Sequence, residues 1–179
     1  MPIDLAAISE REYAPPLARY VERLGGACPD LVAQLASQGE RTAALLAGVP
    51  EKRAGFRYAP GKWSIRDLVG HLADSERVLS YRALCIARGD QAALPGFDEA
   101  TYAAAAGADR RTLADLAAEL AAVRAATIAL FAHLDEQALT RQGIANQSPV
   151  TPRALAAVIA GHELHHLAVL EERYLPAVR

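Results

Sequence analysis

The sequence predicts an all-α protein: a four-helix bundle in up-down-down-up order, with a long crossover between its second and third long helices. Three observations lead to this fold class. Four long segments carry apolar residues at the three- and four-residue spacing of amphipathic helices. No segment shows the apolar–polar alternation of a strand. A long connection, residues 89–111, separates two of the helices, and such connections are uncommon in a compact domain and often functional.

The N-terminal part is irregular, and the first long helix follows it. Prolines and glycines interrupt residues 1–29, where only a short helical piece is expected, at 17–24. The first long helix is predicted over 30–47, because leucines recur along it and Gly48 and Pro50 end the pattern.

The second long helix has the clearest start signal. Ser64 is a favourable N-cap, and Asp67, three residues later, completes a variant of the capping box. Trp63 can fold onto Leu68 as a hydrophobic staple and is interpreted as a packing anchor. The helix is expected to continue to about Ala87.

The third and fourth long helices are bounded in the same way. The third begins after Thr112, with Asp115 in its first turn, and a polar link follows at 136–150. Thr151 and Pro152 open the fourth as N-cap and first helical residue, and its end is expected at 174–176.

Composition limits the class of protein. The length, residues 1–179, suits one domain with a proper core. The net charge is −2 and no block of basic residues occurs, so a nucleic-acid partner is not expected. No segment resembles a signal peptide or approaches the ~20 apolar residues of a membrane span. Cys28 and Cys85 form no disulfide framework. We therefore expect a cytoplasmic protein without a membrane partner.

Two histidines lie at the centre of the inward seam of the fourth helix. The seam steps by four, three, four and three residues through Leu155, Ile159, His162, His166 and Val169. Burying an unpaired polar ring costs about 1–3 kcal/mol, so the pair needs a partner. A metal ion is the simplest partner, because imidazoles at i and i+4 can chelate one ion. A hydrogen-bonded pair of core histidines is the alternative.

A third histidine, His71, is expected at the same level. With a rise of about 1.5 Å per residue, His71 lies roughly 10 Å from the start of its helix, and His166 roughly 10 Å from the end of the fourth. These depths coincide only if the two helices are antiparallel, which requires the crossover at 89–111. His71, His162 and His166 are therefore the predicted metal ligands. Three neutral ligands leave the full charge on the ion, which favours an acidified water or a bound thiolate.

Residues 162–166 also match H-E-x-x-H, the zinc-protease motif in which the glutamate is the general base. A third protease ligand would have to lie among residues 167–179, where no histidine occurs. Glu163 also steps about 100° off the inward seam, so it need not reach a metal-bound water. A protease is therefore disfavoured.

The other polar candidates have structural interpretations. His165 is expected behind the ligands or exposed, and His133 is expected to be solvated. Asp74 could orient a ligand or be a solvated helix acid. Glu76 and Arg82 are interpreted as ion-pairing residues near the surface of the bundle.

The same segments resemble a known family. Residues 62–65 (KWSI) and 70–76 (GHLADSE) are similar to the second-helix signature of the DinB-like superfamily of metalloenzymes. Residues 81–98, which include YRAL, RGD and LPGFD, are similar to one large subgroup, and 161–166 (GHELHH) match its last-helix motif. The resemblance covers the chain from about 13 to 174.

This resemblance implies a four-helix bundle with a crossover, often a homodimer, that holds a divalent zinc or nickel ion on three histidines. Here these fall on His71, His162 and His166. Some relatives transfer low-molecular-weight thiols such as bacillithiol or mycothiol to electrophiles, and others look like hydrolases or isomerases. We therefore expect a metal-dependent enzyme with a small-molecule substrate. The first hypothesis is a thiol S-transferase that uses a low-molecular-weight thiol as cosubstrate. A metal-dependent hydrolase and a non-catalytic metal- or ligand-binding module are the alternatives.

Overall fold

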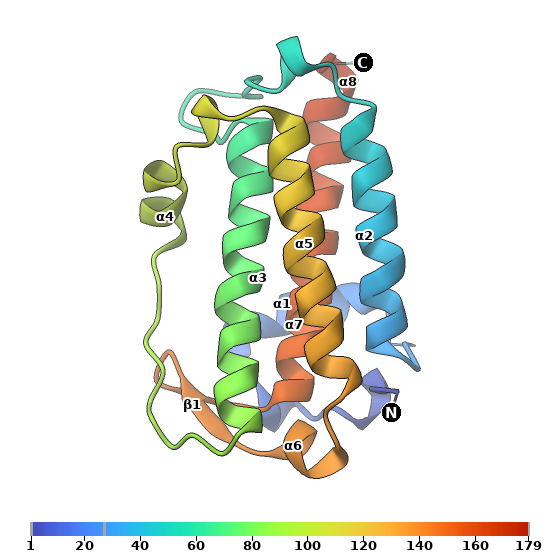
Figure 1. The fold of residues 1–179 in the computed structure, drawn as a ribbon, viewed down its shortest axis with the longest axis vertical. Helices are drawn as coiled ribbons and strands as arrows, with labels where there is room; N and C mark the ends of the chain where they lie inside the picture. The colour runs from blue at the N-terminus through green and yellow to red at the C-terminus, as the bar shows by residue number, and fades with distance from the viewer. Residues whose placement is uncertain (1, 27, 179) are drawn as a thin grey trace.

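Four long helices form the body of the protein. The structure is a computed structural model that describes residues 2–26 and 28–178. Its long helices are α2 (Leu31–Ala47), α3 (Ile65–Ala87), α5 (Leu113–Ala132) and α7 (Pro152–Val169). In Figure 1, α2 and α7 run upward whereas α3 and α5 run downward. The connection between α3 and α5 returns along the outside of α3 and carries α4 (Glu99–Ala105). The predicted four-helix bundle with its crossover is confirmed.

Three of the long helices begin at the N-cap that the sequence predicted, and α2 begins just after Asp30, where its start was expected. The side chains of Asp30, Ser64, Thr112 and Thr151 each accept a hydrogen bond from a backbone N–H in the first turn. At Ser64 the bond is reciprocated, because Asp67 accepts from the backbone N–H of Ser64. Such caps contribute about 1 kcal/mol each. They fix where every helix starts, and so the level at which its side chains lie.

Several short elements lie between the long helices. The piece expected at 17–24 is α1 (Ala18–Val21), which is flanked by 3-10 turns. These flanking turns are η3 (Pro15–Leu17) and η4 (Glu22–Leu24). The other 3-10 turns are η1 (Leu5–Ala7), η2 (Glu10–Glu12), η5 (Glu51–Arg53) and η6 (Ala108–Arg110), and a short helix, α6 (Glu136–Thr140), follows α5.

A small hairpin corrects the expectation of no strands. Strands β1 (Gly143–Ala145) and β2 (Ser148–Val150) pair antiparallel within the link that was expected to be irregular. Asn146 and Gln147 join them with φ angles of 50° and 62°. Two residues with positive φ are typical of the tight hairpin turn whose twist matches that of the strands. Strands of three residues are too short to show an alternating pattern, which is why the sequence did not reveal them.

The end of the fourth helix was predicted too early. After α7 the chain makes one π turn, η7 (Leu170–Tyr174), and continues as α8 (Leu175–Val178). The three segments follow one another without a break, and the π turn ends at Tyr174, just before Pro176, which has no backbone N–H to donate. Among the described residues, no helix is long and apolar enough to cross a membrane.

The core has a polar layer between two apolar clusters. One cluster fills the lower half of the bundle in Figure 1 and the other the upper half. Between them lie buried polar side chains from all four long helices, here called the polar layer: Gln38, Thr42, His71, Ser75, Glu76, Arg124, Thr127, His162 and Glu163. Buried polar groups need partners inside the protein or from a ligand.

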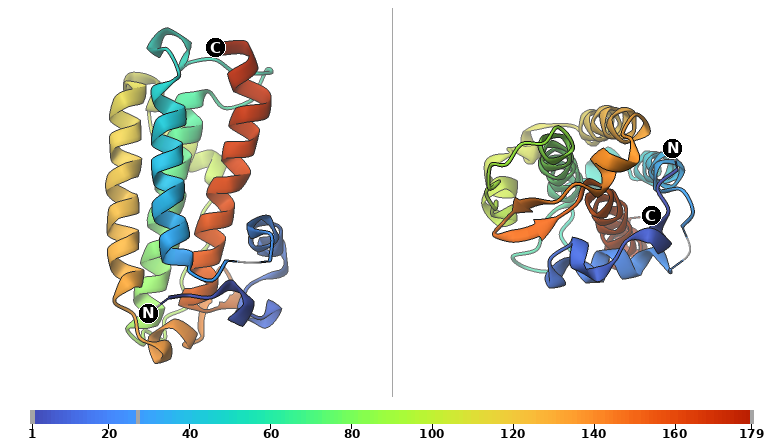
Figure 2. Two further views of the ribbon diagram at one scale, coloured as in Figure 1. Left: turned by 90° about the vertical axis from the view of Figure 1, so that its right-hand side faces the viewer. Right: turned by 90° about the horizontal axis from the view of Figure 1, so that it is seen from below.

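The N-terminal segment packs closely on α7 (Figure 2). At Gly161 the backbone of Tyr20 comes so near that a Cβ atom would overlap the Tyr20 carbonyl oxygen. Only glycine admits this approach, which brings the Tyr20 ring against His162 with ring centroids 5.2 Å apart.

We expect Gly161→Ala to lower the free energy of unfolding by about 1–3 kcal/mol, the usual range for overpacking. The backbone of Tyr20 cannot rotate away as a side chain could. Urea denaturation of the metal-free protein, followed by circular dichroism, measures the change. Gly70→Ala in α3 is the control, because its Cβ would lie 3.8 Å from the Ala108 Cβ, an ordinary contact. There alanine's helix propensity is expected to leave stability unchanged or raise it. Equal behaviour of the two variants would contradict the packing argument.

Candidate metal centre

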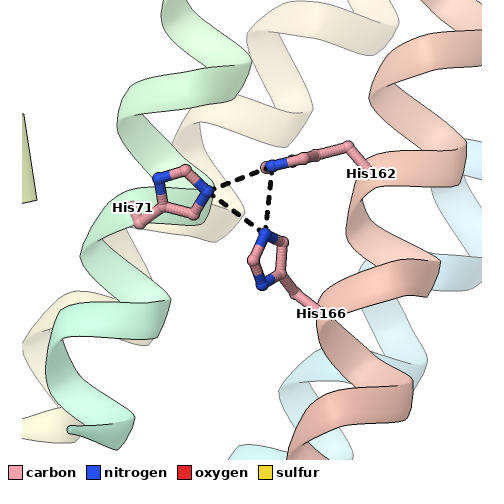
Figure 3. Close-up of side chains that lie close together, drawn as sticks. All are labelled: His71, His162 and His166. Carbon is pink, nitrogen blue, oxygen red and sulfur yellow. Dashed lines mark hydrogen bonds between the residues drawn. The ribbon is translucent and has the colours of Figure 1, made fainter. Parts of the chain in front are cut away.

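Three histidines from two helices meet at one point. His71 projects from α3, and His162 and His166 project from α7 (Figure 3). The Nε2 atoms lie 3.1 Å apart for His71 and His162, 3.2 Å for His71 and His166, and 3.1 Å for His162 and His166. The structure thus brings together all three predicted ligands, at the common level that the depth argument required.

The triangle of nitrogens fits a tetrahedral metal ion. Zinc–imidazole bonds of 2.0–2.1 Å at tetrahedral angles separate the nitrogens by about 3.3 Å. Hydrogen bonds alone suit the triangle poorly, since a neutral imidazole has one N–H and the three Nε2 atoms face one another. A cation at the centre would accept all three lone pairs at once.

Burial keeps these imidazoles in the metal-binding form. Desolvation lowers the pKa of His71 to about 4. Desolvation, followed by the neighbouring imidazoles and arginines, lowers the pKa of His166 to about 3 and that of His162 well below its usual value. All three rings are therefore neutral at pH 7, and neutral imidazole is the form that ligates a metal.

Neighbouring side chains orient the rings. The Ser75 hydroxyl lies 3.3 Å from His71 Nδ1. If Nε2 faces the metal, Nδ1 carries the proton and donates to Ser75, which fixes the tautomer. The Trp63 ring lies 4.5 Å from the His71 ring and 6.3 Å from that of His166, between centroids. Trp63 is thus more than the packing anchor expected, because it covers two of the three imidazoles.

The other sequence candidates lie outside the triangle. His165 is half-buried and packs against Tyr20, and His133 is exposed, as expected. Asp74 pairs with Arg77 rather than with a histidine. Ser75 takes the orienting position instead, and its spacing of four residues from His71 was the available signal.

Glu163 faces away from the histidines into a buried ion-pair network. Its carboxylate accepts hydrogen bonds from Thr42, at 2.7 Å, and from Arg124, at 2.8 Å. Arg124 also pairs with Glu76 through two bonds of 2.7 and 2.8 Å, and donates to the carbonyl oxygen of Leu35. Glu76 is buried, with 4% of its surface exposed, so its predicted place near the bundle surface was wrong although its ion pairing was right.

Arg124 itself was missed. It continues the inward seam of α5, which steps through Leu116, Leu120, Arg124, Thr127 and Phe131. An arginine in that seam, level with an acid on a facing helix, is the signal that could have revealed the network.

Comparisons with known proteins agree with this fold. The model of the DinB superfamily matches residues 34–170. The chain belongs to the DinB superfamily. A search of the curated proteins finds no match.

Two solved structures have the same fold as this DinB protein. YfiT from Bacillus subtilis, described as a probable metal-dependent hydrolase with an unusual four-helix bundle topology, has 18% identity and a TM-score of 0.66, over 92% of this chain and 90% of YfiT. The DinB-like protein YjoA from Bacillus subtilis has 24% identity and a TM-score of 0.57, over 79% of this chain and 86% of YjoA.

A cavity of about 250 Å³ in this DinB protein is bordered by His162, by residues of the hairpin and by residues of the crossover. His162 and Ser75 lie in its wall, with Arg82 and Phe97 further along. Arg82 was predicted near the surface in an ion pair, and this is wrong. It is buried and donates to the carbonyl oxygen of Pro95 at 2.6 Å, and no carboxylate among the described residues pairs with it.

We expect the metal-free protein to lose stability as the pH falls from about 6.5 towards 4. An unfolded histidine takes up its proton near pH 6.5, whereas folded His71 does so at about pH 4. The unfolded state therefore binds more protons in this range, and acid favours unfolding by about 3 kcal/mol for His71 alone. Urea denaturation at stepped pH in a chelator measures this loss. The His71→Gln variant should have a shallower slope between pH 6.5 and 5. Equal slopes would contradict the assignment.

Proposed function

We propose that this chain is a metal-dependent enzyme in which His71, His162 and His166 hold one divalent ion, zinc or nickel. The observation that carries the proposal is the triangle of neutral Nε2 atoms, two of them on buried side chains, next to a cavity that His162 lines. Among the described residues the cluster has three possible ligands and no fourth. A catalytic site commonly keeps a position open for water or substrate, whereas a storage or structural site fills it with protein.

We further propose thiol S-transfer as the reaction. Such an ion, when bound, lowers the pKa of a thiol or water. The thiol would give its proton to solvent and its sulfur would bond to the electrophilic carbon. The bond between that carbon and the leaving group would break, and the leaving group would depart with that electron pair. The chain's own residues support this choice, because Glu163 is engaged by Thr42 and Arg124 and so is not placed as a general base. A preformed thiolate needs no such base.

Hydrolysis is the second candidate. It is favoured by the likeness to YfiT, whose description is that of a probable metal-dependent hydrolase. The same three histidines and the same cavity would serve it. The two reactions differ in whether a thiol or a water molecule attacks the substrate. Assays with different substrates can therefore distinguish them, whereas substitutions of the site residues cannot.

Metal-loaded protein, purified without an affinity tag, should conjugate a low-molecular-weight thiol to monochlorobimane. Bacillithiol, mycothiol, glutathione and cysteine are the thiols to compare, and fluorescence follows the product. Chelation should abolish turnover and added zinc or nickel should restore it. His162→Ala should lose both metal and turnover, because two imidazoles chelate far more weakly than three.

His133→Ala is the matched control, since His133 is exposed and away from the triangle. It should keep full metal content and turnover. Equal metal content in His162→Ala and the unaltered protein would refute the site. A metal-loaded protein that conjugates no thiol but cleaves activated esters would instead establish the hydrolase.

We expect Glu163→Gln to keep its metal and to change kcat only a few-fold. Loss of a general base costs typically 10²–10⁴-fold, but this carboxylate faces Arg124 and Thr42. The amide can still accept from Thr42, so the variant should fold. Steady-state kinetics and metal analysis of the same preparation test this. A fall of a hundredfold or more at unchanged metal content would show that Glu163 acts in the chemistry after all.

A further inference from the structure

Arg82 is a buried cation without an acidic partner among the described residues. Its exposed fraction is 8%. One Nη2–H donates to the Pro95 carbonyl, and the guanidinium carbon lies 5.7 Å from the centroid of the Phe97 ring. These contacts hold the guanidinium in place but leave its charge uncompensated. Arginine remains protonated even where burial lowers its pKa, as it does here.

The other buried arginine is treated differently. Arg124, with 4% of its surface exposed, is matched by Glu76 and Glu163. A buried charge is costly unless it is paired, because the protein interior replaces water poorly. Arg82 reaches the cavity instead, where a ligand can supply the missing charge.

The cavity is otherwise mostly apolar around Arg82. Leu79, Leu155 and Val158 line it together with Arg82 and His162. Glu99 also borders the cavity, but it is exposed to solvent and makes no ion pair with Arg82. Among the described side chains that line this space, the Arg82 guanidinium is therefore the one cationic group that an entering anion meets.

We propose that Arg82 binds a carboxylate of the substrate while the reactive end of the same molecule, or of its cosubstrate, reaches the histidine centre. This inference rests on the proposed metal-dependent function. The single positive charge of the guanidinium matches a ligand with one negative charge. One of its N–H groups bonds to Pro95, and two parallel N–H groups that remain can bond to the two oxygens of a carboxylate.

The spacing sets the shape of the ligand. Eleven residues of α3 separate His71 from Arg82, which is about 16 Å between their Cα atoms. Helical side chains lean towards the N-terminus, so the Arg82 side chain leans back towards the level of His71. The substrate is therefore an extended small molecule with several atoms between its carboxylate and its reactive group.

Calorimetric titration with 6-mercaptohexanoate and 6-mercaptohexanol tests this without relying on turnover. The zinc-loaded protein should bind the carboxylate at least about tenfold more tightly, as expected for one charge-assisted hydrogen-bonded pair. Arg82→Gln should abolish this preference. Arg88→Gln, which removes the same charge at the exposed end of α3, should keep it. Arg82→Lys, which keeps the positive charge but loses the two parallel N–H groups, should keep part of the preference for the carboxylate.

Equal affinities in the unaltered protein, or an undiminished preference in Arg82→Gln, would overturn the proposal. Titration of hexanoate and hexanol into metal-free protein tests the carboxylate site independently of the metal site, so failure of one proposal can be told from failure of the other. A preference for hexanoate that depends on Arg82 supports the carboxylate site even if zinc is not bound. With zinc present, hexanoate is also titrated into protein saturated with 6-mercaptohexanol. If both molecules bind together, the carboxylate site serves the electrophile. If 6-mercaptohexanol prevents hexanoate from binding, the carboxylate site serves the thiol.

Discussion

The polar layer at mid-height of the bundle is the constraint on which the rest of this structure depends. Apolar clusters above and below exclude water from it, so each of its charges and imidazoles needs a partner within reach. Arg124 meets this need on one side by joining acids from α3 and α7. The histidine triangle lies on the other side. Both require the helices to hold their levels closely, which the four capped starts ensure.

The crossover serves the site twice. It makes α3 and α7 antiparallel, which brings His71 level with His162 and His166. It also lays residues 94–99 along α3, where Pro95 and Phe97 hold the Arg82 guanidinium. In an up-down-up-down bundle with short loops, the histidines would separate and this wall of the cavity would be missing. One topological choice therefore determines the centre and the access to it.

Helical periodicity and caps were enough to predict the four long helices, the crossover and the meeting of the three histidines. The two residues whose positions were predicted wrongly, Glu76 and Arg82, share one physical cause. Glu76 and Arg82 were assigned to the surface because charged residues are usually exposed, and only tertiary contacts reveal what compensates a buried one. The hairpin at 143–150 is too short for periodicity to register. The close approach of Tyr20 to Gly161 depends on a chain crossing that no local pattern encodes.

The ion-pair network of the polar layer affects the electrostatics of the histidine triangle beside it. Glu76 and Glu163 face a single guanidinium, so the buried network carries one net negative charge. His162 is the residue next to Glu163 and lines the same small space as Glu76 and Arg124. In a poorly solvated interior, that excess charge favours a nearby positive ion. The hydrogen bonds of Glu163 with Thr42 and Arg124 place its carboxylate in the buried network, so ion pairing inside the bundle accounts for a glutamate at this position of H-E-x-x-H.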